Sequence, residues 1–223
     1  MALKKQIAIA ATLNLPPDDK ASLDKWMSPA LYEATYVRPL LAEDLAHAGA
    51  FARAEAVIAT TPRDCYLCLC LCLCLCLRMR GNIRAIERKW DAANYWFAAA
   101  VAQGSSIPFA YADWGTMLLH KGDYGGAIAK FKLANARGPH FADPLEMWGE
   151  ALMQENRSDL AQAKFDEANK YAPNWGRLHL KWGEALLWSG DKPAAQRQFA
   201  IATHLDLSAA DRAALARVNA MRG

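Results

Sequence analysis

Apolar side chains recur along this chain at offsets of three and four residues, the spacing of one face of an α-helix. Trp114 and Leu118 lie four residues apart on a first predicted helix. Ala127, Phe131 and Ala134 follow at offsets of four and three on a second predicted helix. The pattern therefore predicts two consecutive amphipathic helices.

Glycine and proline mark where these helices end. Gly122 and Gly190 each stand between a first and a second helix, where a left-handed residue is favoured. Pro139 and Pro173 follow second helices, which a proline cannot continue. The prediction is a set of short helices joined in antiparallel pairs.

The helix pairs repeat on a step of 34 residues. The same step backwards from the first pair extends the register to four units without a gap. The main columns are Trp114, Trp148 and Trp182; Gly81, Gly115, Gly149 and Gly183; Ala93, Ala127, Ala161 and Ala195; Phe97, Phe131, Phe165 and Phe199; Ala100, Ala134, Ala168 and Ala202.

The side-chain sizes in the columns predict how the helices pack. Gly115 and Ala127 are small, so the two helices of a pair can approach closely, and Phe131 is expected to fill the gap to the neighbouring pair. One pair cannot bury its apolar face alone and must stack on the next. The predicted fold class is all-α, a right-handed superhelical solenoid of antiparallel helix pairs.

These columns, on this period, resemble the tetratricopeptide repeat (TPR), in chains of bacterial type. The resemblance is strong over residues 74–207. The departures are Arg80 in the tryptophan column, and Ser105 and Leu207 in the proline column. Terminal repeats are often atypical, which accounts for departures at the two ends.

The flanking residues predict the rest of the organisation. Residues 29–73 are interpreted as a degenerate repeat followed by a cysteine–leucine segment, with Gly49 at its turn. Residues 208–223 are predicted to form a capping helix that begins at Ser208. Residues 1–28 are a lead-in without an assigned role.

Composition narrows the function classes. The chain of 223 residues is 53% hydrophobic and 22% charged, with a net charge of +3 and basic and acidic residues mixed throughout. No basic stripe predicts nucleic-acid binding. The longest uncharged stretch, residues 65–77, has 13 residues, fewer than the ~20 that a membrane span needs. We expect a cytoplasmic protein that does not enter a membrane.

All six cysteines fall within residues 65–76, and leucine alternates with cysteine from residue 67 to 77. We interpret this run as an apolar helix start. The alternative is a thiol metal site. On a helix, Cys68, Cys72 and Cys76 share one face while Cys70 and Cys74 point elsewhere, so the thiols do not converge on a tetrahedron. No metal or cofactor is expected.

Catalytic patterns are not found in the sequence. The five histidines are far apart, and neither a G-x-S-x-G nucleophile elbow nor a G-x-x-x-x-G-K-[ST] phosphate loop is present. We expect a protein that is not an enzyme.

The resemblance implies a concave inner wall lined mainly by first helices, which holds a peptide segment. The positions on that wall include Arg78, Asn82 and Thr116. Arg78 and Asn82 resemble the opening pair of the family's clamp for a peptide carboxylate. Asp113 and Asp143 stand where that clamp needs amide or basic groups, so a carboxylate ligand is not expected.

The later repeats place acidic residues on the same wall: Asp143, Glu146, Glu150 and Glu184, with Met153 and Trp188 nearby. Carboxylates beside apolar side chains favour a ligand that carries Lys or Arg together with apolar anchors. A solvated acidic helix face is the alternative interpretation.

The predicted function is a non-catalytic interaction scaffold that binds a protein or peptide segment, basic and apolar in character, in a concave groove. A self-associating structural protein, or a regulatory repeat protein related to a longer signalling protein, is the alternative. Light scattering with and without reductant separates self-association from partner binding.

Overall fold

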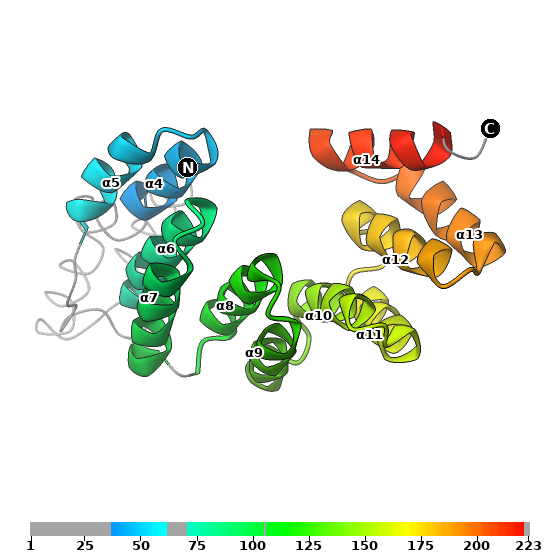
Figure 1. Ribbon diagram of the computed structural model, residues 1–223, viewed down its shortest axis with the longest axis horizontal. Helices are drawn as coiled ribbons and strands as arrows, with labels where there is room; N and C mark the ends of the chain where they lie inside the picture. Colours follow the sequence, from blue (N-terminus) through cyan, green and yellow to red (C-terminus); the bar gives the residue numbers. More distant parts are fainter. Residues whose placement is uncertain (1–36, 62–70, 105, 221–223) are drawn as a thin grey trace, which may run out of the picture. The chain divides into compact units, whose positions relative to one another are not determined.

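The computed structural model describes residues 37–61, 71–104 and 106–220, with the side chains of the first long helix described from Leu75 onward. Every regular element in these ranges is an α-helix (Figure 1). The chain divides into two compact units, residues 1–105 and 106–223, called the N-terminal and the C-terminal unit below. The predicted all-α class built from helix pairs is confirmed.

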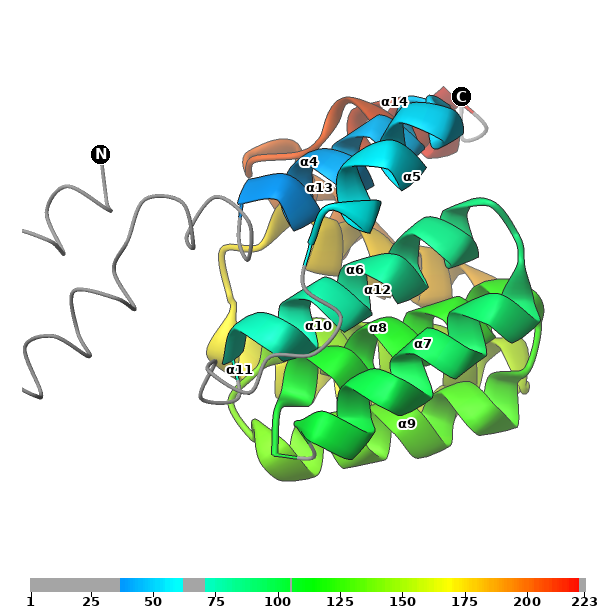
Figure 2. The ribbon, with the colours of Figure 1, turned by 90° about the vertical axis from the view of Figure 1, so that its left-hand side faces the viewer.

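The N-terminal unit contains two helix pairs. They are α4 (Arg38–His47) with α5 (Phe51–Ala59), and α6 (Leu71–Ile86) with α7 (Trp90–Gln103). In Figure 2, α6 and α7 run side by side. Residues 71–77 of the cysteine–leucine run are helical, as predicted, and the rest of that run lies outside the described residues, as do residues 1–36.

The C-terminal unit contains three helix pairs and one further helix. The elements are α8 (Pro108–Lys121), α9 (Tyr124–Arg137), α10 (Ala142–Gln154), α11 (Ser158–Tyr171), α12 (Gly176–Trp188), α13 (Lys192–Thr203) and α14 (Ala209–Ala220). Within the stack, α9 packs on α10 and α11 packs on α12. Helices α9 and α11 end two residues before Pro139 and Pro173, as the sequence predicts.

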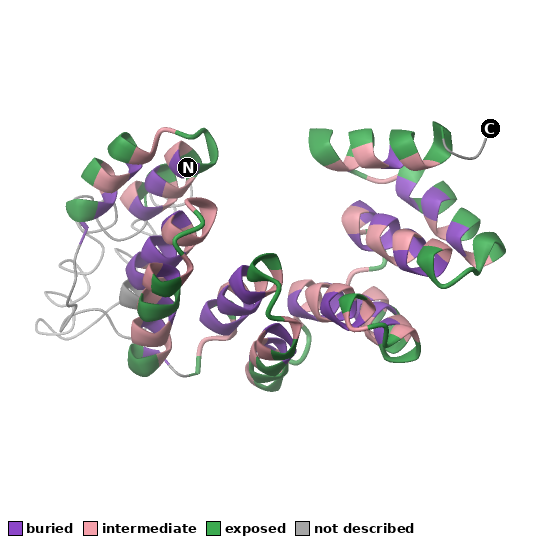
Figure 3. Cartoon of the chain, viewed as in Figure 1, coloured by how far each residue is buried: buried purple, intermediate pink, exposed green. Residues whose placement is uncertain are grey.

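Each first helix touches its second helix at a glycine. A Cβ atom placed on Gly115 would lie 2.6 Å from the ring of Phe131, and one on Gly183 would lie 2.5 Å from Phe199. Gly149 meets Phe165 in the same way, at 2.8 Å. These phenylalanines are buried on the inner side of the second helices (Figure 3). Any larger side chain in the glycine column would force the helices apart.

The phenylalanine column therefore differs from the expectation in one respect. Each ring first covers the glycine of its own pair, and the contact with the neighbouring pair is additional. Phe165 shows both contacts, because its ring also stacks on Trp182 of the next pair, with centroids 6.5 Å apart.

The turn within each repeat contains one residue in the left-handed region. Gly122 and Gly190 have φ values of 88° and 89°, as the sequence predicts. Arg88 and Asn156 occupy the same column with φ values of 60° and 58°, which the sequence did not reveal. A residue with a Cβ in this region is strained, although asparagine tolerates it better than arginine does.

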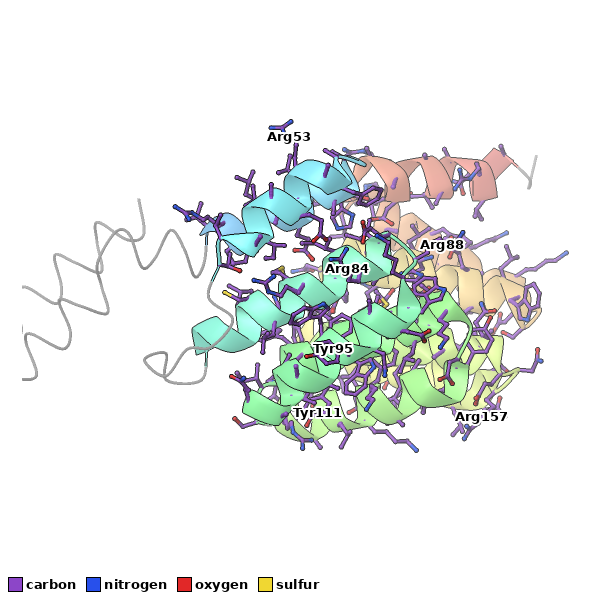
Figure 4. The ribbon with its side chains drawn as sticks, turned by 60° about the vertical axis from the view of Figure 1, so that its left-hand side comes forward. Arg53, Arg84, Arg88, Tyr95, Tyr111 and Arg157 are labelled. Atoms are coloured by element: carbon purple, nitrogen blue, oxygen red, sulfur yellow. The ribbon has the colours of Figure 1, made fainter. Side chains whose placement is uncertain are left out.

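Replacing Arg88 with glycine is expected to stabilise the N-terminal unit by roughly 0.5–1 kcal/mol, because glycine adopts the left-handed conformation without steric cost. Arg88 lies at the turn between α6 and α7 (Figure 4). Chemical denaturation measures the change in the free energy of unfolding. Asn156→Gly is the matched control and should gain less. A loss of stability in Arg88→Gly would contradict the interpretation of strain at this turn.

Helix α14 covers the end of the stack. The Ser208 hydroxyl accepts a hydrogen bond from the Asp211 backbone N–H at 3.1 Å, so the predicted cap is confirmed. Leu215 is buried in a cluster with Leu180 and Phe199, and Val218 packs against that cluster. The helix buries apolar surface of α12 that would otherwise be open to solvent.

Two arginines of α6 serve the packing of the N-terminal unit. The Arg80 guanidinium donates hydrogen bonds to the carbonyl oxygens of Ile58, at 2.7 Å, and Thr61, at 3.2 Å, and so caps the C-terminal end of α5. Arg84 forms ion pairs with Glu55 and Glu87 (Figure 4). Arginine therefore stands in the tryptophan column because its side chain joins α6 to α5.

Candidate functional site

A cavity of about 280 Å³ opens on the C-terminal unit where α10, α11 and α12 meet. Its lining combines apolar, amide and charged side chains. The lining residues are Glu150, Met153, Gln154, Asn156, Phe165, Lys181, Glu184, Ala185 and Trp188. The helix pairing brings these residues together, because α10 and α12 are successive first helices and α11 lies between them along the chain.

Trp188 is the most unusual member of this lining. It ends α12 with 78% of its surface exposed. Large aromatic side chains usually bury most of their surface, so an exposed indole at the edge of a cavity marks a place where a partner can remove apolar area from water. Glu150, Glu184 and Trp188 had been predicted from the sequence as groove residues, and the fold places all three around one cavity.

Glu146 occupies a different place from the one expected. Its side chain is fully buried, although the sequence predicted that it would face a ligand. The equivalent positions one repeat before and after are Ala112 and Leu180, which are buried and apolar. Glu146 therefore stands in a core column, beneath the cavity wall, and is not available to a partner.

Two basic residues of α12 were missed by the sequence analysis. The Arg177 guanidinium lies 2.9 Å from a Glu150 carboxylate oxygen and 3.4 Å from Glu146. The Lys181 ammonium lies 3.0 Å from Glu184 and 3.7 Å from Glu150. The signal was present, because each of these cations follows its partner glutamate by 31 residues, and that spacing joins successive first helices.

Arg177 also connects the site to the capping helix. Its guanidinium lies 3.9 Å from Asp211 on α14. The acidic wall predicted from the sequence is thus a mixed network of ion pairs in which Arg177 is the central cation. A solvated acidic face, the alternative interpretation, does not describe these residues, because their carboxylates contact cations of the same chain.

Burial changes the protonation of the network. Desolvation, together with the neighbouring Glu150 charge, raises the pKa of Glu146 well above its ordinary value, and the opposing effect of Arg177 is smaller. Desolvation also raises the pKa of Asp143. The nearby Glu150 and Glu184 carboxylates hold Lys181 in its charged form and raise its pKa.

The network carries an excess of negative charge even when Glu146 is protonated. Four carboxylates remain, and two cations oppose them, which leaves a formal charge of −2. The carboxylates are Asp143, Glu150, Glu184 and Asp211, and the cations are Arg177 and Lys181. Such a site attracts positively charged groups.

The other predicted groove residues do not line this cavity. Arg78 and Asn82 are on α6 in the N-terminal unit, where the Asn82 amide donates a hydrogen bond to Glu43 of α4. On α8, the Thr116 hydroxyl donates to the Ala112 carbonyl oxygen at 3.1 Å. The clamp-like pair on α6 therefore has a carboxylate of its own chain beside it.

The periodic tryptophans lie mostly inside the stack. Trp114 is buried, and Trp148 and Trp182 are half-buried. A lysine of the second helix covers the first two rings: Lys130 lies 3.3 Å from the Trp114 centroid, and Lys164 lies 4.2 Å from that of Trp148. The tryptophan column thus combines packing with cation–ring contacts.

Two negative findings concern the described residues alone. No helix among them is both long and apolar enough to cross a membrane. No group of three His, Cys, Asp or Glu side chains in the same ranges is arranged to hold a metal ion. Of the six cysteines, only Cys76 has a described side chain, and it is buried.

Solved structures of TPR proteins have the same fold. PilF from Pseudomonas aeruginosa matches 86% of this chain and 87% of its own at a TM-score of 0.63 and 15% identity. YrrB, described as "a TPR protein with an unusual peptide-binding site", matches 89% of this chain and 97% of its own at 0.55 and 15%. MamA matches 79% and 98% at 0.56 and 17%.

The class of protein follows from these matches and from the columns described above. The chain has the TPR fold, and the resemblance inferred from its sequence is confirmed at that level. No protein-family model matches the sequence, and a search of curated proteins gave no match.

Proposed function

We propose that this protein is a non-catalytic interaction module whose C-terminal unit binds a protein segment at the α10–α12 cavity. The segment carries a basic residue together with apolar side chains. The proposal extends the sequence-based prediction and restricts it to residues that the fold brings together.

One observation carries the proposal: an exposed indole and two carboxylates surround a cavity in a unit whose helix interfaces are otherwise filled. The glycine and phenylalanine columns close the space within each pair. The cavity edge is different, since Trp188 remains exposed and Glu184 is only partly covered. A partner that covers the indole and approaches the carboxylates satisfies both features. The peptide-binding site named for YrrB shows that this fold supports such a role.

Replacing Trp188 with alanine and Glu184 with lysine is expected to abolish capture of the partner. The full-length chain is immobilised, proteins of its source cell are captured, and mass spectrometry identifies those that bind. A retained partner is then titrated against the double variant. Loss of an anchoring aromatic residue alone costs about 2 kcal/mol or more at a typical interface, a decrease of about 30-fold in affinity. Glu150 is left unchanged because its carboxylate pairs with Arg177 and Lys181 inside the fold.

Leu160→Ala combined with Asp166→Lys provides the matched control. Both residues are exposed on α11, outside the cavity lining. The control variant should bind like the unmodified chain. Equal binding by the Trp188/Glu184 variant would exclude this site, and light scattering of each sample shows whether the captured species is a second copy of the chain.

A further inference from the structure

We propose that the cavity beside Trp188 accepts a single arginine side chain of the partner. Its aliphatic part lies along Met153, and its guanidinium lies between the Trp188 indole and the Glu184 carboxylate. This inference rests on the proposed function and specifies the chemistry that the same site recognises.

The size of the cavity limits the occupant to about one long side chain. A cavity of about 150 Å³ holds a benzene molecule. Sites for drug-sized ligands and cofactors begin at about 300 Å³. At about 280 Å³, the cavity lies between these values. It has room for one extended side chain with little space to spare.

The chemistry of the walls matches an amphipathic side chain. Met153, Phe165 and Ala185 provide apolar surface, whereas Glu150 and Glu184 provide carboxylates in the same cavity. A purely apolar side chain would leave carboxylates beside hydrocarbon, which is unfavourable. A side chain with an apolar stem and a cationic end satisfies both kinds of wall.

The chain already contains the same type of contact. Arg177 places its guanidinium 2.9 Å from the Glu150 carboxylate and 4.0 Å from the Met147 sulfur. Lysines cover the rings of Trp114 and Trp148 on other first helices. Within the described part of the chain, no cation is found over the Trp188 ring, and its exposed face is open to a cation from outside.

Arginine fits this arrangement better than lysine. Its planar guanidinium can stack on an indole and donate two parallel hydrogen bonds to a carboxylate, whereas an ammonium does not provide a flat surface for stacking. The Trp188 indole and the Glu184 carboxylate both line the cavity, so one guanidinium can reach both groups.

Lys181 opposes the incoming charge. Its ammonium lies 3.0 Å from Glu184 and carries the same sign as the proposed ligand. Removing this cation while keeping an apolar side chain of similar length, as in Lys181→Met, leaves Glu184 to the ligand alone. The affinity for an arginine side chain should then increase.

The test is a nuclear magnetic resonance titration of the full chain with the blocked tripeptide acetyl-Gly-Arg-Gly-amide. The indole N–H resonance of Trp188 is assigned by its loss in Trp188→Phe. We expect this resonance to shift with a Kd on the order of 1 mM, which is typical of one side chain with few contacts. The citrulline peptide has the same shape without the charge and should bind at least fivefold more weakly. The lysine peptide should fall between them.

Charge variants provide the second measurement. Glu184→Gln should weaken binding of the arginine peptide about two- to fivefold, and Lys181→Met should strengthen it by a similar factor, as expected for exposed ion pairs. Asp166→Asn, on the exposed side of α11, should change nothing. Equal binding of the citrulline and arginine peptides, or no change in Glu184→Gln, would overturn the proposal.

The two proposals can fail separately. If a captured partner requires Trp188 but the arginine peptide leaves the indole resonance unmoved, the site binds a partner through other chemistry and the arginine inference is wrong. If the peptide binds with the expected charge dependence but no captured protein requires Trp188, the arginine site stands and the proposed function is wrong.

Discussion

Replacing Phe131 with alanine is expected to lower the free energy of unfolding of the C-terminal unit by about 3–5 kcal/mol. The ring is fully buried and fills the space above Gly115, where the backbone offers no side chain of its own. Truncation removes the ring and leaves a cavity that neither helix can close. Urea denaturation followed by circular dichroism measures the loss. Leu133→Ala on the same helix is the matched control, and it should cost less than about 1 kcal/mol because Leu133 is largely exposed.

The glycine opposite the ring provides a second test of this contact. Gly115→Ala should cost about 1–3 kcal/mol, since its Cβ would lie 2.6 Å from the Phe131 ring. Combined with Phe131→Leu, the same substitution should cost less than the sum of the two single changes. Strict additivity would mean that the glycine and the ring do not meet.

Replacing Arg177 with leucine is expected to destabilise the C-terminal unit by about 2–3 kcal/mol at neutral pH. Removing one partner of a buried ion pair costs about 3–5 kcal/mol, and the lower figure applies because Glu150 is partly exposed and Glu146 can take up a proton. Chemical denaturation at several pH values measures the change.

The pH dependence has a definite sign. The pKa of Glu146 is raised in the folded chain, so the folded state holds a proton that the unfolded state releases. The stability that this proton provides is complete below the ordinary pKa of a glutamate and is lost as the pH rises through the folded value. Removing Arg177 raises that pKa further, so Arg177→Leu should cost more at pH 8 than at pH 5.

Glu146→Leu together with Arg177→Leu is the control for this network. It places leucine where the next repeat has Leu180, which is fully buried. Apolar replacement of a buried ion pair is often neutral or stabilising, so the double variant should recover much of the loss and show a weaker dependence on pH. A cost for Arg177→Leu that does not change with pH would contradict the assignment of a protonated Glu146.

The fold could be predicted because close packing leaves a record in side-chain size. Gly149 and Phe165 lie 16 residues apart, and the same two residue types recur one period later as Gly183 and Phe199. A helix pair that relies on this contact accepts few other residues at either position. The helix ends were predictable for a similar reason, since Gly122 and Pro139 each have few conformational alternatives.

The site was only partly predictable because charge does not fix position as strictly as size does. Glu146 resembles a surface residue in the sequence, and its burial depends on Arg177 from the next first helix. The left-handed conformation of Arg88 gives no signal in its residue type either. In both cases the packing of neighbouring helices, rather than local preference, decides the structure.

The glycine–phenylalanine contact has a consequence for how recognition can change in this protein. Because that contact holds each repeat together from within, the outward positions are free to vary: the place of Glu150 and Glu184 is taken by Thr116 on α8. Grafting the residues that surround Trp188 onto the equivalent positions of α8 and α10 would move the specificity by one repeat. The scaffold is thus a row of interchangeable sockets, and selectivity resides in a few transferable side chains.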